Sequence, residues 1–287
     1  MAFSVNTNVG AMAALQELNR TSKGMGVTQD RITSGKNVNS TKDDSATYVT
    51  AQGLRGKQGD LKAVTSSLSN AKSVVDIAVS GTEQISDLVN QMKTLAKQSA
   101  DNTISGDQRI SLNNDFQGLL KQVTVITNSA EFNGKNLLTA LPANGINPLQ
   151  SLAMVDPDGD GVFTPDTMNV PGANLALPNT GAVLNTGSLI DTPGNATTVA
   201  GYLDVYNGTV KTALSALGSA SRQIDAQLTF TSKLNDTIEA GIGNLVDADM
   251  AKESARLTAL QTKQQLGVQA LSIANQAPQM IGQLFKG

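Results

Sequence analysis

The acidic side chains around residue 158 are those whose type and spacing come closest to a known chemistry. Asp156, Asp158 and Asp160 fall at positions 1, 3 and 5 of a calcium-binding loop, and a glycine follows at position 6. Position 12 is Thr167 instead of a bidentate glutamate, and strand-like segments stand where helices should flank the loop. We therefore interpret these residues as a hairpin turn and expect no metal site.

The other acidic pairs are Asp43 with Asp44, and Asp247 with Asp249. Catalytic carboxylates need an enclosed pocket that shifts their pKa values, whereas both of these pairs lie at predicted breaks between helices. Aspartate at such a break accepts hydrogen bonds from the first N–H groups of the next helix, so we expect capping roles.

Two missing residue types narrow the chemistry further. The chain has no Cys and no His, which removes thiolate nucleophiles, disulfides, the commonest general base and the commonest metal ligands. The net charge is −3 and no Lys/Arg cluster is interleaved with aromatic residues, so no nucleic-acid partner is expected. Residues 264–285 lack charge but carry seven Gln and Asn, which makes membrane insertion costly. The sequence predicts neither an enzyme nor a cofactor site.

The elements that position these residues are long helices. Between residues 61 and 96, apolar side chains recur at alternating intervals of three and four, the spacing of a helix packed along other helices. The same spacing returns between residues 202 and 245, and a third helix around Phe116 is expected to fold back on the first. We expect the two long helices to pair within the subunit through a core seam. Its residues are Leu61, Leu68, Val75, Ile85, Val89, Met92, Val210, Leu217, Ile224, Leu234 and Ile238.

Thinner apolar stripes mark the two ends of the chain. Residues 4–34 form a predicted helix with one face of Val5, Val9, Met12, Leu15 and Leu18. The last predicted helix has a face of Met250, Leu257, Leu260, Val268 and Leu271, and Pro278 is expected to end or bend it. Long helices with such narrow stripes are marginal alone, so each needs a partner.

The centre of the chain has a different character. Residues 141–200 hold seven of the eight prolines and five acidic residues, without Lys or Arg. Leu149–Val155 and Val162–Val170 read as two strands, so we expect an exposed β-hairpin and loop module. The predicted fold class is mainly α: an elongated antiparallel bundle or coiled coil of long helices, with a small β-hairpin module inserted mid-chain.

Five dispersed motifs resemble those of bacterial flagellins, over residues 3–139 and 202–285. They are Ser4-Val-Asn-Thr-Asn-Val9, Asn39-Ser-Thr-Lys-Asp-Asp44, Leu95-Ala-Lys-Gln-Ser-Ala100, Glu131-Phe-Asn-Gly134 and Ala274-Asn-Gln-Ala-Pro278. The resemblance implies a structural subunit that polymerises into the bacterial flagellar filament for swimming motility. A hook–filament junction protein of related helical architecture is the alternative.

The resemblance also implies an organisation for each segment. Residues 1–40 and 247–287 would be inner-tube helices, residues 41–140 and 201–246 the two halves of an outer-tube helical domain, and residues 141–200 a variable module. The terminal helices would order on assembly into a coiled-coil inner tube. The expected polymerisation interface is Val5, Val9, Met12, Leu15, Leu257, Leu260, Val268 and Leu271.

The resemblance also implies partners and a cellular location. The resemblance implies a helical homopolymer, joined with other flagellins in some filaments, and contacts with a flagellar export chaperone, a cap and hook-associated proteins. It places the protein outside the cell, in the filament, after export through the flagellar type III apparatus.

Overall fold

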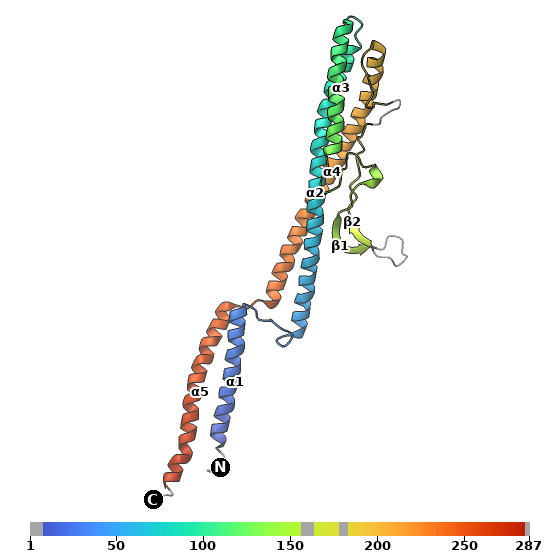
Figure 1. Cartoon of the computed structure of the whole chain (residues 1–287). Coiled ribbons are helices and arrows are strands. Elements are labelled where there is room, and N and C mark those ends of the chain that lie inside the picture. Colours follow the sequence, from blue (N-terminus) through green and yellow to red (C-terminus); the bar gives the residue numbers. More distant parts are fainter. Residues whose placement is uncertain (1–7, 156–163, 178–182, 285–287) are drawn as a thin grey trace. The chain divides into compact units, whose positions relative to one another are not determined.

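The structure, a computed structural model, describes residues 8–155, 164–177 and 183–284, with only the backbone at 154–155 and 277–284. These residues are mainly α-helical, as the sequence predicts (Figure 1). The helices are α1 (Val9–Ser34), α2 (Ser45–Ser99), α3 (Gly106–Ser129), α4 (Pro193–Val246) and α5 (Met250–Leu284). A short 3-10 helix (Pro142–Asn144) and the strands β1 (Leu149–Val155) and β2 (Thr164–Thr167) lie between α3 and α4. Pro278 does not end α5, which continues to Leu284.

The chain forms two compact units. One, here called the terminal unit, comprises Met1–Gly56 and Thr237–Gly287, and the other, the core unit, comprises Lys57–Asp236. Both α2 and α4 contribute residues to each unit.

The core unit is built around the apolar seam of α2. Every position in the three-four series from Leu61 to Ala96 is buried, and the hydroxyl of Thr82 donates to the carbonyl of Ala78 at 2.6 Å. Of the α4 residues in the predicted seam, Val210, Leu217 and Ile224 are buried. Leu234 near the end of the unit is half-buried, as is Ile238, which belongs to the terminal unit. The core therefore is deepest away from the end where α2 and α4 leave the unit.

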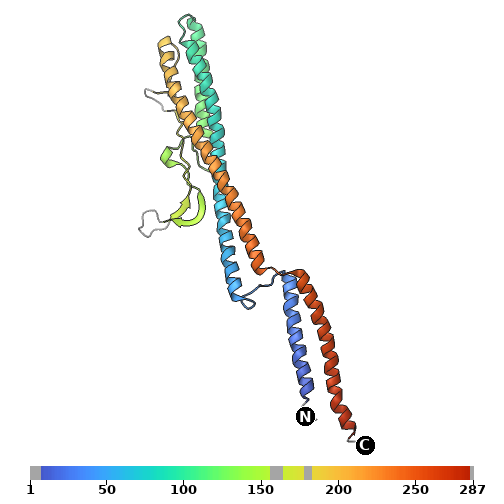
Figure 2. The same ribbon diagram turned by 180° about the vertical axis from the view of Figure 1, so that it is seen from behind.

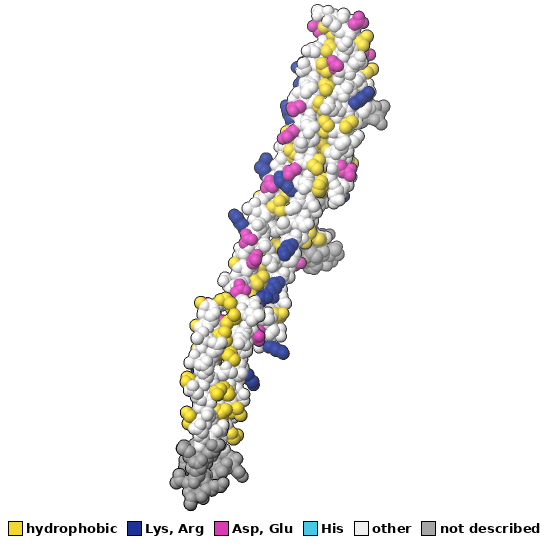
Figure 3. All heavy atoms as spheres, turned by 60° about the vertical axis from the view of Figure 1, so that its left-hand side comes forward, with side chains coloured by type: hydrophobic (Ala, Val, Ile, Leu, Met, Phe, Trp, Pro, Cys, Tyr) yellow, Lys and Arg dark blue, Asp and Glu magenta, His cyan; other side chains and the backbone are white. Residues whose placement is uncertain are grey.

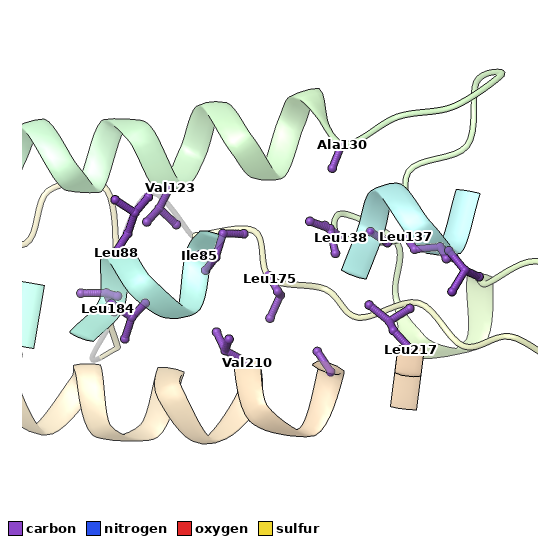
Figure 4. Packing of buried hydrophobic residues seen from close by; sticks show 14 of the residues in the cluster. Ile85, Leu88, Val123, Ala130, Leu137, Leu138, Leu175, Leu184, Val210 and Leu217 are labelled. Carbon is purple, nitrogen blue, oxygen red and sulfur yellow. The ribbon is translucent and has the colours of Figure 1, made fainter. Parts of the chain in front are cut away.

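Helix α3 closes the core unit as a third layer along α2. Figure 4 shows Ile85 of α2, Val123 of α3 and Val210 of α4 directed into one interior. The turn between α2 and α3 is held at both ends. Ser105 and Gln108 form a reciprocal capping box at the start of α3, and the Arg109 guanidinium donates to the carbonyl of Ser99, the last residue of α2, and to that of Asp101 in the turn.

The central segment is only partly the exposed module that its composition predicts: its hairpin is largely exposed, but its irregular chain is not. Several of its apolar side chains are buried in the core, namely Met168, Val170, Leu175, Leu184 and Ile190. Its backbone is tied to the helices as well: Tyr206 of α4 donates to the Leu175 carbonyl at 2.7 Å, and the Ile190 N–H donates to Asn113 of α3 at 2.9 Å. Burial raises the pKa of Tyr206 above its ordinary value.

The predicted hairpin is present as an antiparallel pair of β1 and β2. The described part of its second strand, Thr164–Thr167, ends before the predicted Val170, although Val170 still forms an isolated bridge with Ile146. The turn with Asp156, Asp158 and Asp160 lies outside the described residues. Among the described residues, no cluster of three or more His, Cys, Asp or Glu side chains could hold a metal ion.

Candidate polymerisation surface on the terminal helices

The terminal unit begins with helices whose ends are capped by local side chains. The Asn8 side chain accepts from the Ala11 N–H at 3.0 Å, and α1 ends at Gly35, which adopts the left-handed conformation with φ of 68°. Asp249 accepts from two N–H groups in the first turn of α5, which confirms its predicted capping role. The backbone of Asp247 forms a bridge with Lys36 instead.

Asp44 also has the predicted capping role, whereas Asp43 binds backbone N–H groups of the turn before α2 and not those of the helix. Asp44 accepts hydrogen bonds from the N–H groups of Ala46 and Thr47 at the start of α2. Asp43 accepts from the N–H groups of Asn39 and Ser40. These hydrogen bonds lower the pKa of both carboxyls: the largest contribution is the Thr47 hydroxyl for Asp44 and the Asn39 N–H for Asp43. Both are exposed, so no catalytic environment surrounds them.

Helices α1 and α5 pack against each other along their length in antiparallel order (Figures 1 and 2). The side-chain amide of Asn8 donates to the Ala274 carbonyl at 2.7 Å, and Arg31 lies beside Glu253 at the other end. At two positions, a leucine of one helix packs against a glycine of the other. A Cβ on Gly267 would lie 3.3 Å from Leu18, and a Cβ on Gly24 would lie 3.6 Å from Leu260.

The side chains between α1 and α5 are mostly small or polar, and they follow the three-four spacing on both helices. On α1 the buried and half-buried positions of this seam are Ala11, Ala14, Leu18, Thr21, Met25, Thr28 and Ile32. On α5 they are Glu253, Leu257, Leu260, Gln264, Gly267, Leu271 and Ala274. Small side chains allow the two helices to approach closely, but they bury little apolar area.

Some of the residues that we expected at the polymerisation interface face the partner helix within the chain, and others face outward. Leu257, Leu260 and Leu271 are half-buried on the side of α5 that faces α1. Leu18, predicted on the same face as Val9, is also half-buried on this seam. The prediction of a common face was wrong, because nine residues span two and a half helical turns and place these two side chains on opposite sides. Val5 lies outside the described residues.

Large apolar side chains cover the outward sides of the same helices. On α1, Val9 is 75% exposed, Met12 59% and Leu15 48%. On α5 the exposed apolar residues include Val268, Leu266 and Ile273. Figure 3 shows hydrophobic side chains gathered over the terminal unit. An apolar stripe of this size on a helix indicates a surface that another protein covers.

Charge is absent from these parts of the chain. Residues 1–16 and 264–285 contain no Asp, Glu, Lys or Arg, and the antiparallel pairing brings the described residues of these two segments side by side. The apolar stripe therefore belongs to one continuous, uncharged end of the α1–α5 pair. No helix in the described part of the chain is both long and apolar enough to cross a bilayer.

Leu266 and Ile273, which are 59% and 69% exposed, were not among the predicted interface residues. They belong to a second three-four series on α5, with Ala259 and Ala270, on the side away from α1. That series could have been found in the sequence, because the spacing of seven between these two residues is the heptad period.

Comparison with known proteins decides the family. Residues 5–141 match the bacterial flagellin N-terminal helical region, and residues 201–285 match the bacterial flagellin C-terminal helical region. The chain belongs to the bacterial flagellin family. The interval between the two matches contains the central segment of the core unit, from Pro142 to Ala200.

Full-length relatives agree with this assignment. Flagellin FljK of Caulobacter vibrioides is 40% identical over 283 residues, which cover 99% of this chain and 98% of the relative. A flagellin of Brucella melitensis is 33% identical over 291 residues, covering 99% of both chains. This flagellin is accordingly a structural subunit of the flagellar filament, and the junction-protein alternative is not favoured. Flagellins polymerise with other flagellins into this extracellular filament.

A solved structure from Vibrio parahaemolyticus, described as a flagellar hook-associated protein, has a similar fold. Its TM-score is 0.54 with 13% sequence identity, and the match covers 71% of this chain and all of that chain. At this identity the similarity concerns the fold alone. It agrees with the mainly α architecture of the core and terminal units.

Proposed function

We propose that the α1–α5 pair forms the inner layer of the filament and contacts neighbouring subunits through its outward apolar stripe. Val9, Met12 and Leu15 of α1 are the proposed contacts on one helix, with Val5 in the preceding segment. Leu266 and Ile273 are the proposed contacts on one flank of α5, and Val268, about 200° around the helix from Leu266, is a proposed contact on the other flank. Leu257, Leu260 and Leu271 contribute indirectly, because they hold α5 against α1.

One observation carries this proposal: the large apolar side chains are exposed where the helix pair has no charge. In a separate subunit these side chains stay in water, and their transfer to a protein interface is favourable in proportion to the area buried. In the proposed contact, the outward stripe of one subunit packs against a different surface of the neighbouring subunit. Such a heterologous contact does not close on itself and therefore propagates as a helical polymer.

The same contacts explain how assembly would order the terminal helices. Eight of the fourteen seam positions between α1 and α5 are Ala, Thr, Gly, Gln or Glu, so burial within one chain supplies only limited apolar area. Contacts with neighbouring subunits supply the missing apolar burial, and ordering is coupled to polymerisation. Residues 1–40 and 247–287 would then form the inner tube, and residues 41–140 and 201–246 the outer tube.

The family membership supports further partners. We propose that the chain leaves the cell unfolded through the flagellar type III apparatus and that an export chaperone covers its C-terminal helix. Polymerisation would follow beneath a cap at the filament tip, with hook-associated proteins at the base. An exposed apolar helix is a suitable chaperone target because it presents a long hydrophobic stripe before assembly.

Deletion of residues 250–287 tests the proposed inner layer. The core unit has its own buried interior, so the truncated protein should remain a helical, soluble monomer. It should form no filaments when seeds or a precipitant are added, whereas the full-length protein should form tubes of uniform width in negative-stain micrographs. Filaments of the truncated protein would refute the proposal.

A further inference from the structure

Arg31 and Glu253 form an ion pair inside the seam between α1 and α5. The guanidinium Nη1 lies 3.3 Å from Oε1 of Glu253. Glu253 is only 6% exposed, although glutamate is a residue that seldom leaves water without a partner. Arg256 is the only other cation within ion-pair distance in the described part of the chain, at 4.0 Å from the same oxygen, and its side chain is largely exposed.

The polar atoms of this layer are incompletely paired. Within the described structure, Oε2 of Glu253, Nε of Arg31 and Oγ1 of Thr28 are buried without a hydrogen-bond partner. A buried ion pair of this kind contributes less to stability than apolar side chains of similar volume would, because its desolvation cost is only partly offset. Stability alone therefore does not account for a buried glutamate in this seam.

The rest of the seam discriminates poorly between partners. Both helices carry small and apolar side chains at the same three-four spacing, so α1 could pack on α1 of another subunit, and α5 on another α5. A shift by one heptad would also keep most apolar positions facing each other. In a filament, where many copies of both helices are concentrated, such pairings compete with the observed one.

The backbone contacts next to this layer do not resolve the ambiguity. The Ala248 N–H donates to the Gly35 carbonyl at 2.9 Å, and the Asn37 N–H donates to the Val246 carbonyl at 2.7 Å. Main-chain groups are present in every copy and at every register, so these bonds do not distinguish one chain from another.

We infer that Arg31 and Glu253 select the partner and the register of α1 and α5, so that each α1 pairs with α5 of its own chain. Pairing of like helices would bury Arg31 or Glu253 without an opposite charge. A register shifted by one heptad would place Gly24 and Thr21 where Arg31 and Thr28 now face the buried carboxylate, and neither carries a charge. Both errors carry the penalty of an unpaired buried charge. This inference rests on the proposed role of the α1–α5 pair in the filament.

Charge reversal tests the inference, with every variant made in an Arg256→Gln background so that an arginine introduced at position 253 meets no second arginine. Arg31→Glu and Glu253→Arg should each raise the critical concentration for polymerisation by about a hundredfold or more. The double reversal should restore it to within about tenfold of the background protein. Thermal unfolding of the core unit, followed by circular dichroism, should be the same in all variants.

Mixing the two single variants separates pairing within a chain from pairing between chains. Each variant carries the charges that complement the other, so an equimolar mixture would polymerise if α1 paired with α5 of a neighbour. We expect no rescue, because each chain contains two like charges at its own pair. Rescue by mixing would overturn the assignment of the pair to one chain.

A cross-link reports the register in assembled filaments, since the chain contains no cysteine. A Cβ on Gly267 would lie 4.0 Å from Cβ of Leu18, within the range of a disulfide. Leu18→Cys with Gly267→Cys should therefore form an intrachain disulfide in the background protein and in the double reversal. Loss of this cross-link in double-reversal filaments would contradict the inference.

The outcomes distinguish this inference from the proposed function. If the Arg256→Gln background protein fails to polymerise while the unsubstituted protein succeeds, Arg256 and not the buried pair is decisive, and the inference is wrong. If the unsubstituted protein forms no filaments, the proposed function fails. If filaments form and the single reversals polymerise as readily as the background protein, only the inference about Arg31 and Glu253 fails.

Discussion

Ile273 allows the energetic contribution of the outward stripe to be measured. Its side chain is 69% exposed on α5, in the uncharged end of the helix pair. Full burial of an isoleucine side chain contributes about 1.5–3 kcal/mol, so the part still exposed would contribute about 1–2 kcal/mol per subunit when a neighbour covers it. Ile273→Ser should therefore raise the critical concentration for polymerisation by about 5–30-fold.

Val205 provides a matched control, because it is also 69% exposed but lies on α4 in the core unit. Val205→Ser removes a branched apolar side chain from a helix surface in the same way, so it has a similar effect on helix propensity. The assay is sedimentation of filaments grown from equal seeds, with the soluble protein in the supernatant giving the critical concentration. Circular dichroism of the soluble subunits checks that neither variant has lost helix.

Two results would refute the reasoning. An unchanged critical concentration for Ile273→Ser would show that no neighbour covers this part of the stripe. An equal increase for Val205→Ser would show that exposed apolar residues matter wherever they lie, so that the terminal helices have no special role. The expected result is an increase for Ile273→Ser several times larger than that for Val205→Ser.

Two further predictions concern the stability of the subunit. Met92→Ala removes a fully buried side chain from the core unit and should lower the free energy of unfolding by about 2–5 kcal/mol in urea titrations, whereas the exposed Val125→Ala should change it by no more than about 0.5 kcal/mol. Asp44, whose pKa is lowered from 3.8 by its capping hydrogen bonds, should stabilise the start of α2 above that pH and lose this contribution as the pH falls through the lower folded-state pKa. Thermal unfolding between pH 2 and 6 should show a smaller acid dependence for Asp44→Asn, and an unchanged profile would contradict the capping role.

The sequence is a good guide to the core unit because long helices repeat one local rule. The three-four spacing from Leu61 to Ala96 coincides with burial at every position, including Ala and Thr positions that are only weakly apolar. A side chain on such a helix is buried or exposed according to its angular position, which follows directly from residue number. The caps at Asp44 and Asp249 could be predicted for the same reason, since their hydrogen bonds reach only two or three residues ahead.

The central segment shows where local rules no longer apply. Leu175 and Ile190 are fully buried, yet they lie in irregular chain without helical or alternating periodicity. Their burial depends on contacts with Tyr206 of α4 and Asn113 of α3, which are distant in the sequence. Composition alone suggested an exposed module, because prolines and acidic residues are usually found at surfaces.

The sequence by itself determined that each terminal helix has an apolar stripe and that this stripe is too narrow to stabilise the helix alone. Only the tertiary structure decided which stripe pairs within the chain. The larger side chains of Val9 and Met12 remain outside, and the smaller ones of Ala11 and Ala14 face α5. The physical reason is that close packing of two helices depends on the shape of both surfaces, as with Leu18 against Gly267, and neither helix carries that information in its own sequence.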